Sequence, residues 1–258
     1  MIYRYSYTTE SSFSPEVTWH FFKLRAIPCT NEFQKVTDDC LEIRPSCLVS
    51  RATDGLGNAV QWGTISQGHS SFTVTSEGTV NQLLPYAIHE SPEPYYIAPT
   101  RLTAWNDEMS AAALNKKKDG SVFDSARNIM RMVNKHMTYT PCLTTTETSA
   151  IEVYEDPRGV CQDYAHLMIA LCRAAGIYAR YVNGIIAGTG QTHAWVEVSD
   201  GNVWLAFDPT HNTMPEWGYV KIAHGRDAND CPTNRGRFYS WTTERQTVMC
   251  QLSPNIIY

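Results

Sequence analysis

A cysteine stands at the start of a helix that the sequence predicts from Cys161 to about Ala175. Apolar residues recur at helical spacing between residues 165 and 172, and Gly176 follows, as glycine commonly does at a helix end. Because the first backbone N–H groups and the dipole of a helix favour negative charge, a thiol placed there is favoured as the thiolate. The thiolate is the form that attacks carbonyl carbons, so this stretch predicts a reactive cysteine.

Three strands are expected after this helix, because β-forming runs alternate with turn signals. The predicted strands are Ala179–Ile186, His193–Val198 and Val203–Asp208, and the turns are Gly188–Gln191 and Ser199–Asn202. A helix followed by an antiparallel meander predicts an α+β fold for this half of the chain.

The first part of the chain is predicted to be a separate β module. Apolar and polar residues alternate at Leu41–Arg44 and Ser71–Thr75, and turn dipeptides lie between such runs. Four prolines then fall within residues 85–100, and proline disfavours both helix interiors and central strands. We therefore predict an antiparallel β-rich domain at 1–85, an extended Pro-rich linker at 86–100 and a catalytic domain at 101–258.

Composition limits the partners and the compartment. The net charge of −5 argues against nucleic acid as a general partner, and the run Lys116–Lys118 is expected to be a solvated loop or helix end. No segment is long and apolar enough to span a membrane, and the N-terminus does not resemble a signal peptide. The 8 cysteines form no Cys-x-x-Cys pair, which is typical of reduced thiols. We therefore expect a cytoplasmic protein without a membrane partner.

Three residues at the ends of the predicted elements form a candidate catalytic set. In a hairpin, the start of one strand lies beside the end of its partner, so His193 and Asp208 are predicted neighbours. If the helix packs on the same face, Cys161 reaches the other ring nitrogen of the histidine. This is the arrangement of a thiol triad, with Cys161 as nucleophile, His193 as general base and then acid, and Asp208 as the residue that orients the imidazole.

Two other assignments are less favoured. His211 is a rival for the base, but it lies beyond the strand end and has no hairpin partner. A zinc site from Cys161, His166 and Cys172 fails on helix geometry, since Cys161 and His166 are about 140° apart and Cys172 lies about 16 Å further along the axis. We expect His166 to be a buried hydrogen-bonding residue that braces the helix.

Four separated blocks closely resemble the transglutaminase-like superfamily, in particular its bacterial branch, whose members are often described as candidate cysteine proteases. They occur in the family's order and spacing. The blocks are Gly159–Leu167, Ala174–Gly184, Thr192–Val198 and Phe207–Thr210. The segment Gly225–Asp230 resembles a further block, and the β-rich start with Asp54–Asn58 resembles the N-terminal region that accompanies this branch.

The resemblance covers nearly the whole chain and implies a papain-like catalytic core with Cys161, His193 and Asp208 as its triad. Tyr178 and Cys231 depart from the family's usual residues, and neither belongs to the proposed triad. Animal transglutaminases of the superfamily depend on calcium, but no EF-hand-like loop or acidic ligand cluster occurs in this sequence. We expect neither a metal nor an organic cofactor.

The leading hypothesis is an enzyme that attacks a carboxamide or peptide carbonyl of a protein or peptide substrate through Cys161. A thioester forms, ammonia or an amine leaves, and water or a second amine resolves the thioester. The motif leaves both hydrolysis and transfer to an amine acceptor open. Backbone N–H groups at the helix start are the expected oxyanion donors. The alternative is a catalytically weak or inactive module that binds a protein partner through the β domain.

Overall fold

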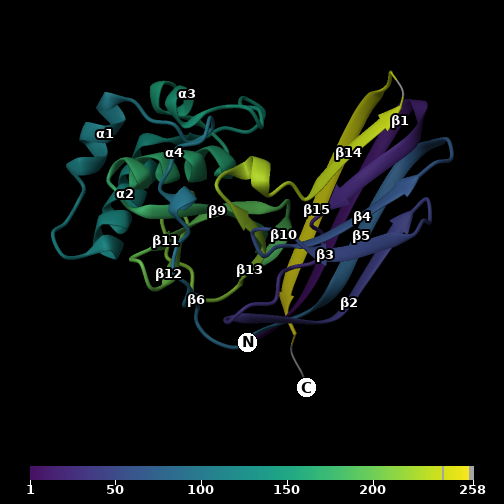
Figure 1. The fold of residues 1–258 in the computed structure, drawn as a ribbon, viewed down its shortest axis with the longest axis horizontal. Helices are drawn as coiled ribbons and strands as arrows, with labels where there is room; N and C mark the ends of the chain where they lie inside the picture. The colour runs from purple at the N-terminus through teal and green to yellow at the C-terminus, as the bar shows by residue number, and fades with distance from the viewer. Residues whose placement is uncertain (240, 256–258) are drawn as a thin grey trace.

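Two antiparallel sheets organise the chain in this computed structural model, which describes residues 1–239 and 241–255. The larger sheet has eight strands, and the long first strand is its centre (Figure 1). Its members are β1 (Ile2–Leu24), β2 (Gln34–Arg44), β3 (Val49–Thr53), β4 (Ala59–Ile65), β5 (His69–Gln82), β10 (Gly188–Gly190), β14 (Asn234–Tyr239) and β15 (Thr243–Pro254).

The alternating sequence of β1 explains why it holds this sheet together. Tyr3, Tyr5 and Tyr7 are all buried on one face of the strand, as a period of two requires. The first half of β1 pairs with β5 and β15, and its second half pairs with β4 and β14. The antiparallel β structure expected for the N-terminal region is therefore confirmed.

The two C-terminal strands lie in this first sheet, far in sequence from their neighbours. Strand β15 runs beside β1 from Tyr3↔Pro254 to Ser14↔Thr243. It also pairs with β10, which follows directly on the strand β9 of the second sheet. The predicted division at residues 85 and 100 stays a prediction, but residues 234–254 add strands to the sheet that the N-terminal residues begin.

The smaller sheet is the platform for the predicted chemistry. It has five strands in the order β13-β9-β11-β12-β6, all antiparallel. Their bounds are β6 (Ala87–Ile88), β9 (Tyr178–Ile186), β11 (His193–Ser199), β12 (Trp204–Phe207) and β13 (Tyr219–Gly225). The short strands β7 (Thr138–Tyr139) and β8 (Arg158–Gly159) form a separate parallel pair.

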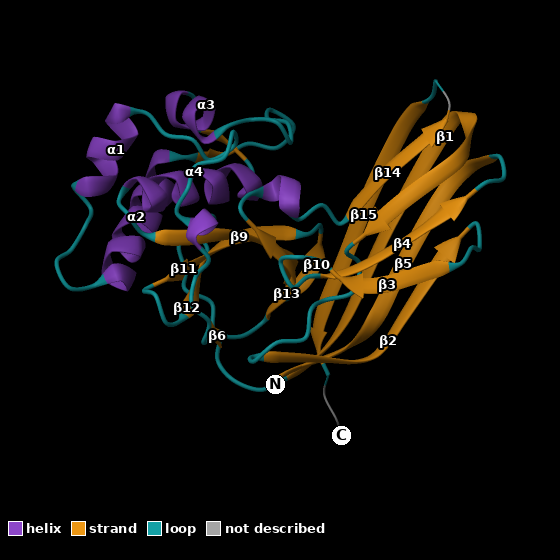
Figure 2. Cartoon of the chain, in the orientation of Figure 1, coloured by secondary structure: helices purple, strands orange, loops and turns teal. Residues whose placement is uncertain are grey.

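Four helices gather beside this smaller sheet, whereas the other end of the molecule is built of strands (Figure 2). They are α1 (Asp107–Leu114), α2 (Val122–His136), α3 (Ala150–Glu155) and α4 (Cys161–Ala174), with single turns of 3-10 helix at Pro94–Tyr96 and Ala228–Asp230. Helix α4 packs on β9 and β11 and contacts the other three helices. The fold is thus the predicted α+β arrangement, with a cysteine-bearing helix on an antiparallel sheet.

Helix α4 is the core helix, and its sequence accounts for both of its ends. Every residue from Asp163 to Arg173 is buried, including the fully covered side chains of Leu167 and Ile169. The helix ends where predicted, because Gly176 adopts a φ of +75° that other residues rarely take. None of the helices in the described part of the chain is long and apolar enough to cross a membrane.

The Pro-rich stretch at 86–100 is packed against the protein rather than only spanning a gap. Ala87 and Ile88 form strand β6 beside β12, and the side chains of Tyr86 and Tyr96 are buried. Apart from strand β6 and the 3-10 turn at Pro94–Tyr96, the segment has no regular secondary structure, in keeping with its prolines. Its aromatic side chains nevertheless make it part of the wall of the second sheet.

Candidate active site

The first turn of α4 is fixed by a carboxylate two residues after Cys161. Asp163 accepts hydrogen bonds from the backbone N–H of Val160 at 2.8 Å and from the Thr144 hydroxyl at 2.7 Å. Burial raises the pKa of this carboxyl, while these two hydrogen bonds act to lower it. A side chain on Gly159 would collide with the Asp163 carboxylate, which explains the glycine at this position. Cys161 therefore sits at a rigidly held helix start.

The hairpin of β11 and β12 brings His193 and Asp208 together. The register pairs Val196 with Phe207, so the residue that opens β11 lies near the residue that follows β12. His193 Nε2 lies 2.8 Å from Asp208 Oδ2, and both side chains are buried. The neighbourhood expected from hairpin geometry is present in the structure.

Cys161 reaches the same imidazole from α4. Burial alone would lower the pKa of His193, but hydrogen bonds to Asp208 and to the Cys161 sulfur, together with their negative charges, raise it to about 9. At neutral pH the imidazolium is therefore the favoured form of His193 beside these two groups. The structure brings together all three residues of the predicted catalytic set.

Asp208 is surrounded by donors. Its Oδ2 accepts from His193, from His211 Nδ1 at 2.7 Å and from the Tyr219 hydroxyl at 2.7 Å. Its Oδ1 accepts from the backbone N–H groups of Thr210 at 2.9 Å and His211 at 3.2 Å. Burial would raise the pKa of Asp208, but the hydrogen bonds and the charge of His193 hold it well below its usual range. The carboxylate is thus ionised and fixed in orientation.

His211, the rival candidate for the base, is a neighbour of the set. Its ring lies 5.0 Å from that of His193, centroid to centroid, and its side chain is 49% exposed. It bonds to the same carboxylate oxygen as His193, so the two imidazoles share one acceptor. His193 makes the hydrogen bond to the Cys161 sulfur, which favours His193 over His211 as the base.

Tyr219 was missed by sequence reasoning. It opens β13, the strand at the far edge of the sheet, and its hydroxyl donates to Asp208. Burial, followed by the charge of Asp208, raises its pKa, so Tyr219 stays a neutral donor. No local signal marks it, because its position depends on the pairing of β13 with β9 and of β9 with β11.

Trp195 lies behind the imidazole on the same face of β11. Its ring is 6.3 Å from that of His193 and 5.3 Å from that of Tyr219, centroid to centroid. Its Nε1 donates to the Tyr86 hydroxyl at 3.1 Å, and that hydroxyl donates to Glu197 at 2.6 Å. Trp195 thus connects the candidate site to a polar network deeper in the protein.

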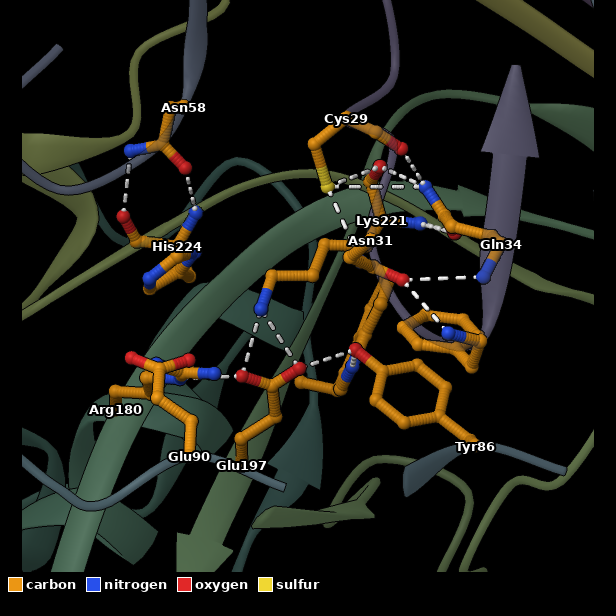
Figure 3. A network of polar contacts seen from close by, with 12 residues as sticks. Cys29, Asn31, Gln34, Asn58, Tyr86, Glu90, Arg180, Glu197, Lys221 and His224 are labelled. Atoms are coloured by element: carbon orange, nitrogen blue, oxygen red, sulfur yellow. Dashed lines mark hydrogen bonds and ion pairs between the residues drawn. The ribbon is translucent and has the colours of Figure 1, made fainter. Parts of the chain in front are cut away.

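That network is buried and charged (Figure 3). The Glu197 carboxylate accepts hydrogen bonds from Lys221 Nζ at 2.9 and 2.8 Å and also forms an ion pair with Arg180. All three side chains are at most 1% exposed. Burial would raise the pKa of Glu197, but the two cations hold it far below its usual range. Two cations meet one buried carboxylate here, so the cluster depends strongly on Glu197.

A groove of about 870 Å³ opens at Cys161 and His193. Its walls come from Tyr139, Pro141 and Cys142, from the chain between Ile185 and His193, and from Thr210 and His211. Cys250 of the first sheet also lines the groove. Among the described residues that line it there is no aspartate, glutamate, lysine or arginine. The groove therefore suits an uncharged chain better than a charged one.

His166 has the buried, hydrogen-bonded environment that the sequence predicts. His166 is fully buried and accepts a hydrogen bond from the Ala228 N–H at 3.2 Å, so its predicted bracing role is confirmed. Burial lowers its pKa to about 3, which leaves it neutral.

In the described part of the chain, the group with ligand atoms close enough for a metal is His193, Asp208 and His211, within 4.8 Å of one another. In this group, Asp208 already accepts hydrogen bonds from both imidazoles.

A thiol at the start of a buried helix, packed on an antiparallel sheet that carries histidine and aspartate, defines the papain-like α+β class. Two family models match the chain. That of the transglutaminase-like superfamily matches residues 107–209, and that of the bacterial transglutaminase-like N-terminal region matches residues 3–81. The chain therefore carries a transglutaminase-like core, preceded by a bacterial transglutaminase-like N-terminal region.

Several relatives and a solved structure are similar to this chain over most of its length. An uncharacterized protein of Mycobacterium tuberculosis is 28% identical over 92% of this chain and 88% of its own. One of Mycobacterium leprae is 26% identical over 90% of this chain and 91% of its own. The crystal structure of a "putative cysteine protease" from Cytophaga hutchinsonii covers 100% of this chain and 93% of its own, with a TM-score of 0.79 and 24% identity, and shows the same fold.

Proposed function

We propose that the protein is an enzyme in which Cys161 forms a thioester with the acyl group of a carboxamide or peptide. The thiolate attacks the carbonyl carbon, and the charge that develops on oxygen is met by backbone N–H groups at the start of α4. The carbon–nitrogen bond then breaks as His193 gives its proton to the leaving nitrogen, which departs as ammonia or an amine.

Resolution of the thioester restores the enzyme. His193, now neutral, takes a proton from water or from a second amine, and that nucleophile displaces the Cys161 sulfur. Water gives a carboxylic acid, so the reaction is hydrolysis. An amine gives a new amide, so the reaction is acyl transfer.

One observation carries this proposal: His193 is held between the Cys161 sulfur and the Asp208 carboxylate, with a pKa of about 9. Because Nε2 bonds to Asp208, Nδ1 is left for Cys161. An imidazolium at this place stabilises the thiolate before attack and supplies the proton that the leaving group needs. Asp208 orients the ring in both steps.

The substrate in this proposal is a protein or peptide amide, with an amine as the optional second substrate. Because none of the described residues that line the groove is an aspartate, glutamate, lysine or arginine, the groove supports an uncharged amide in a peptide and does not favour nucleic acid. A membrane partner and a cofactor have no part in the proposed reaction.

A cytoplasmic location belongs to the same proposal. All eight cysteines are free thiols, as expected in a reducing compartment. Cell fractionation with an antibody against the chain tests the location, and recovery outside the cytoplasm would remove this part.

The rate of iodoacetamide labelling at each cysteine tests the chemistry. Cys161 is half-buried, whereas Cys40 and Cys142 are exposed and Cys142 lines the same groove. Accessibility alone therefore predicts faster labelling of the exposed pair, and only a reactive thiolate makes Cys161 the fastest.

We expect Cys161 to be labelled at least about tenfold faster than Cys142 near neutral pH, and His193→Ala to remove that advantage. The rate at Cys142 in the same variant is the internal control. Slow, uniform labelling of all exposed cysteines would overturn the proposal and favour a module that only binds a protein partner.

A further inference from the structure

A cationic hollow that shares no residue with the groove at Cys161 lies beside the segment between α1 and α2. Figure 1 shows this segment on the helical side of the molecule. Its volume is about 780 Å³. It is lined by Asn115, Lys116, Lys117, Lys118, Asn128, Arg131, Met132, Lys135 and His136. Five of these residues are lysine or arginine, and none of the described lining residues is aspartate or glutamate, although the whole chain carries a net charge of −5.

The hollow has two walls of like charge that face each other. One wall is the loop of Lys116, Lys117 and Lys118 after α1, which is the solvated loop that the sequence predicts. The other wall is one face of α2, where Arg131 and Lys135 are four residues apart. Like charges at this spacing destabilise a helix, and the opposing lysines add to the repulsion.

Contacts within the protein offset little of this charge. Lys117 Nζ donates to the Ala175 carbonyl at the end of α4, at 3.2 Å. Among the described residues, no carboxylate forms an ion pair with Lys116, Lys118, Arg131 or Lys135. The dipole of α2 accounts for a cation at Lys135 in its last turn, but not for the lysines across the hollow.

We propose that this hollow binds a small ligand that carries several phosphate groups, such as a short polyphosphate chain. Lysine and arginine are the side chains that bind phosphate oxygens, and several of them around one hollow match several phosphates close together. The volume lies within the range of small-molecule sites, about 300–1,000 Å³. Asn115 and Asn128 add uncharged amide groups beside the cations.

The lining favours recognition of the phosphates alone. In the part of the chain that the structure describes, no tryptophan, tyrosine or phenylalanine lines the hollow, so a nucleic-acid base has no such ring on which to stack. The imidazole of His136 is engaged with the Tyr154 carbonyl at 3.0 Å. The structure thus offers concentrated charge without a platform for a base, and inorganic tripolyphosphate is the simplest probe.

The test is a calorimetric titration of the whole chain with sodium tripolyphosphate in about 50 mM salt, where screening of charges is weak. We expect one saturable site that weakens severalfold when the salt is raised to about 300 mM. Lys118→Gln combined with Lys135→Gln removes one cation from each wall and is expected to weaken binding at least about tenfold. Arg131→Gln alone is a second variant with the same expected direction.

The matched control is Lys35→Gln combined with Arg237→Gln, which removes two exposed charges on strands β2 and β14. It should bind tripolyphosphate like the unchanged chain. All variants should keep the labelling rate of Cys161, because the hollow shares no residue with the groove.

Three results would each overturn the proposal. The first is the absence of saturable binding up to about 10 mM tripolyphosphate at low salt. The second is equal weakening in the control and in the two hollow variants. The third is equal or tighter binding of an oligoglutamate peptide or a single-stranded oligonucleotide, which would mean an acidic macromolecule instead.

Discussion

Replacing Asp208 by asparagine removes one charge from the candidate site and nearly preserves the shape of the side chain. In the native protein Oδ2 accepts hydrogen bonds from His193, His211 and Tyr219, at 2.8, 2.7 and 2.7 Å. An amide turned with its oxygen toward these donors keeps the contacts without the charge. An amide turned the other way sets NH2 against three donors, so the imidazole loses its orientation.

The size of the effect follows from the pKa of His193. It stands at about 9 against an ordinary value of 6.5, which corresponds to about 3 kcal/mol in favour of the imidazolium. Asp208 and Cys161 share this stabilisation. If Asp208 supplies half, its charge is worth about 1.5 kcal/mol, or about tenfold in the ratio of imidazolium to neutral imidazole. Loss of orientation adds to this, so we expect labelling of Cys161 to slow by about 10- to 100-fold and acylation by an amide to slow further.

The assay compares iodoacetamide labelling of Cys161 in Asp208→Asn and in Asp200→Asn. Asp200 is an exposed carboxylate in the turn of the same hairpin, where it accepts hydrogen bonds from the backbone N–H groups of Asn202 and Val203, and it lies outside the groove. Circular dichroism should give the same spectrum for both variants. A folded Asp208→Asn protein that labels Cys161 within about threefold of the native rate would refute the reasoning.

Four further predictions follow from neighbouring groups. Amide cleavage should decline as pH rises through about 9, because His193 loses the proton that the leaving group needs, while iodoacetamide labelling of Cys161 should persist; parallel decline of both would contradict this. Because the pKa of His193 is raised on folding, its contribution to stability is complete below about pH 6.5 and is lost as the pH rises through about 9. The temperature of thermal unfolding should therefore fall more steeply between pH 6 and pH 10 in the native protein than in His193→Ala. Tyr219→Phe should slow labelling of Cys161 by about tenfold, since it deletes one hydrogen bond to the ionised Asp208, and an unchanged pH profile of labelling would make Tyr219 merely structural. Glu197→Gln should lower the free energy of unfolding in urea by about 3–5 kcal/mol, because it leaves Lys221 buried without a carboxylate and Arg180 with only the partly exposed Glu90, and a loss below about 1 kcal/mol would contradict that origin.

Local patterns in the sequence were enough to locate the reactive hairpin and helix. Helical spacing followed by Gly176 set the end of α4, and turn signals set the ends of β11 and β12. These elements place Cys161, His193 and Asp208 at their ends, so their proximity follows from short-range rules. Their catalytic role stays a proposal until the thiol is tested.

Contacts between distant segments could not be predicted in this way. Tyr219 reaches Asp208 only because β13 pairs with β9, and no periodicity in the sequence specifies that pairing. The same holds for β15, which closes the first sheet from the other end of the chain.

Glu197 illustrates a misleading local signal. A charged residue in an alternating strand normally faces water, yet Glu197 is fully buried. It can stay buried because the Tyr86 hydroxyl donates a hydrogen bond to it, and because Lys221 and Arg180 supply opposite charges. Pairing of these groups across four segments is visible only in the folded chain (Figure 3).

The central claim is that Cys161 forms an acyl-enzyme, and intact-mass spectrometry tests it most directly. The protein is incubated with a library of glutamine-containing peptides, with and without a primary amine, and the mass of the chain is followed over time. We predict a transient adduct that maps to Cys161 and is absent in Cys161→Ser. Faster loss of the adduct with the amine means acyl transfer, and loss in water alone means hydrolysis. Iodoacetamide labelling that is no faster at Cys161 than at the exposed Cys142, together with no adduct from any amide, would contradict the account.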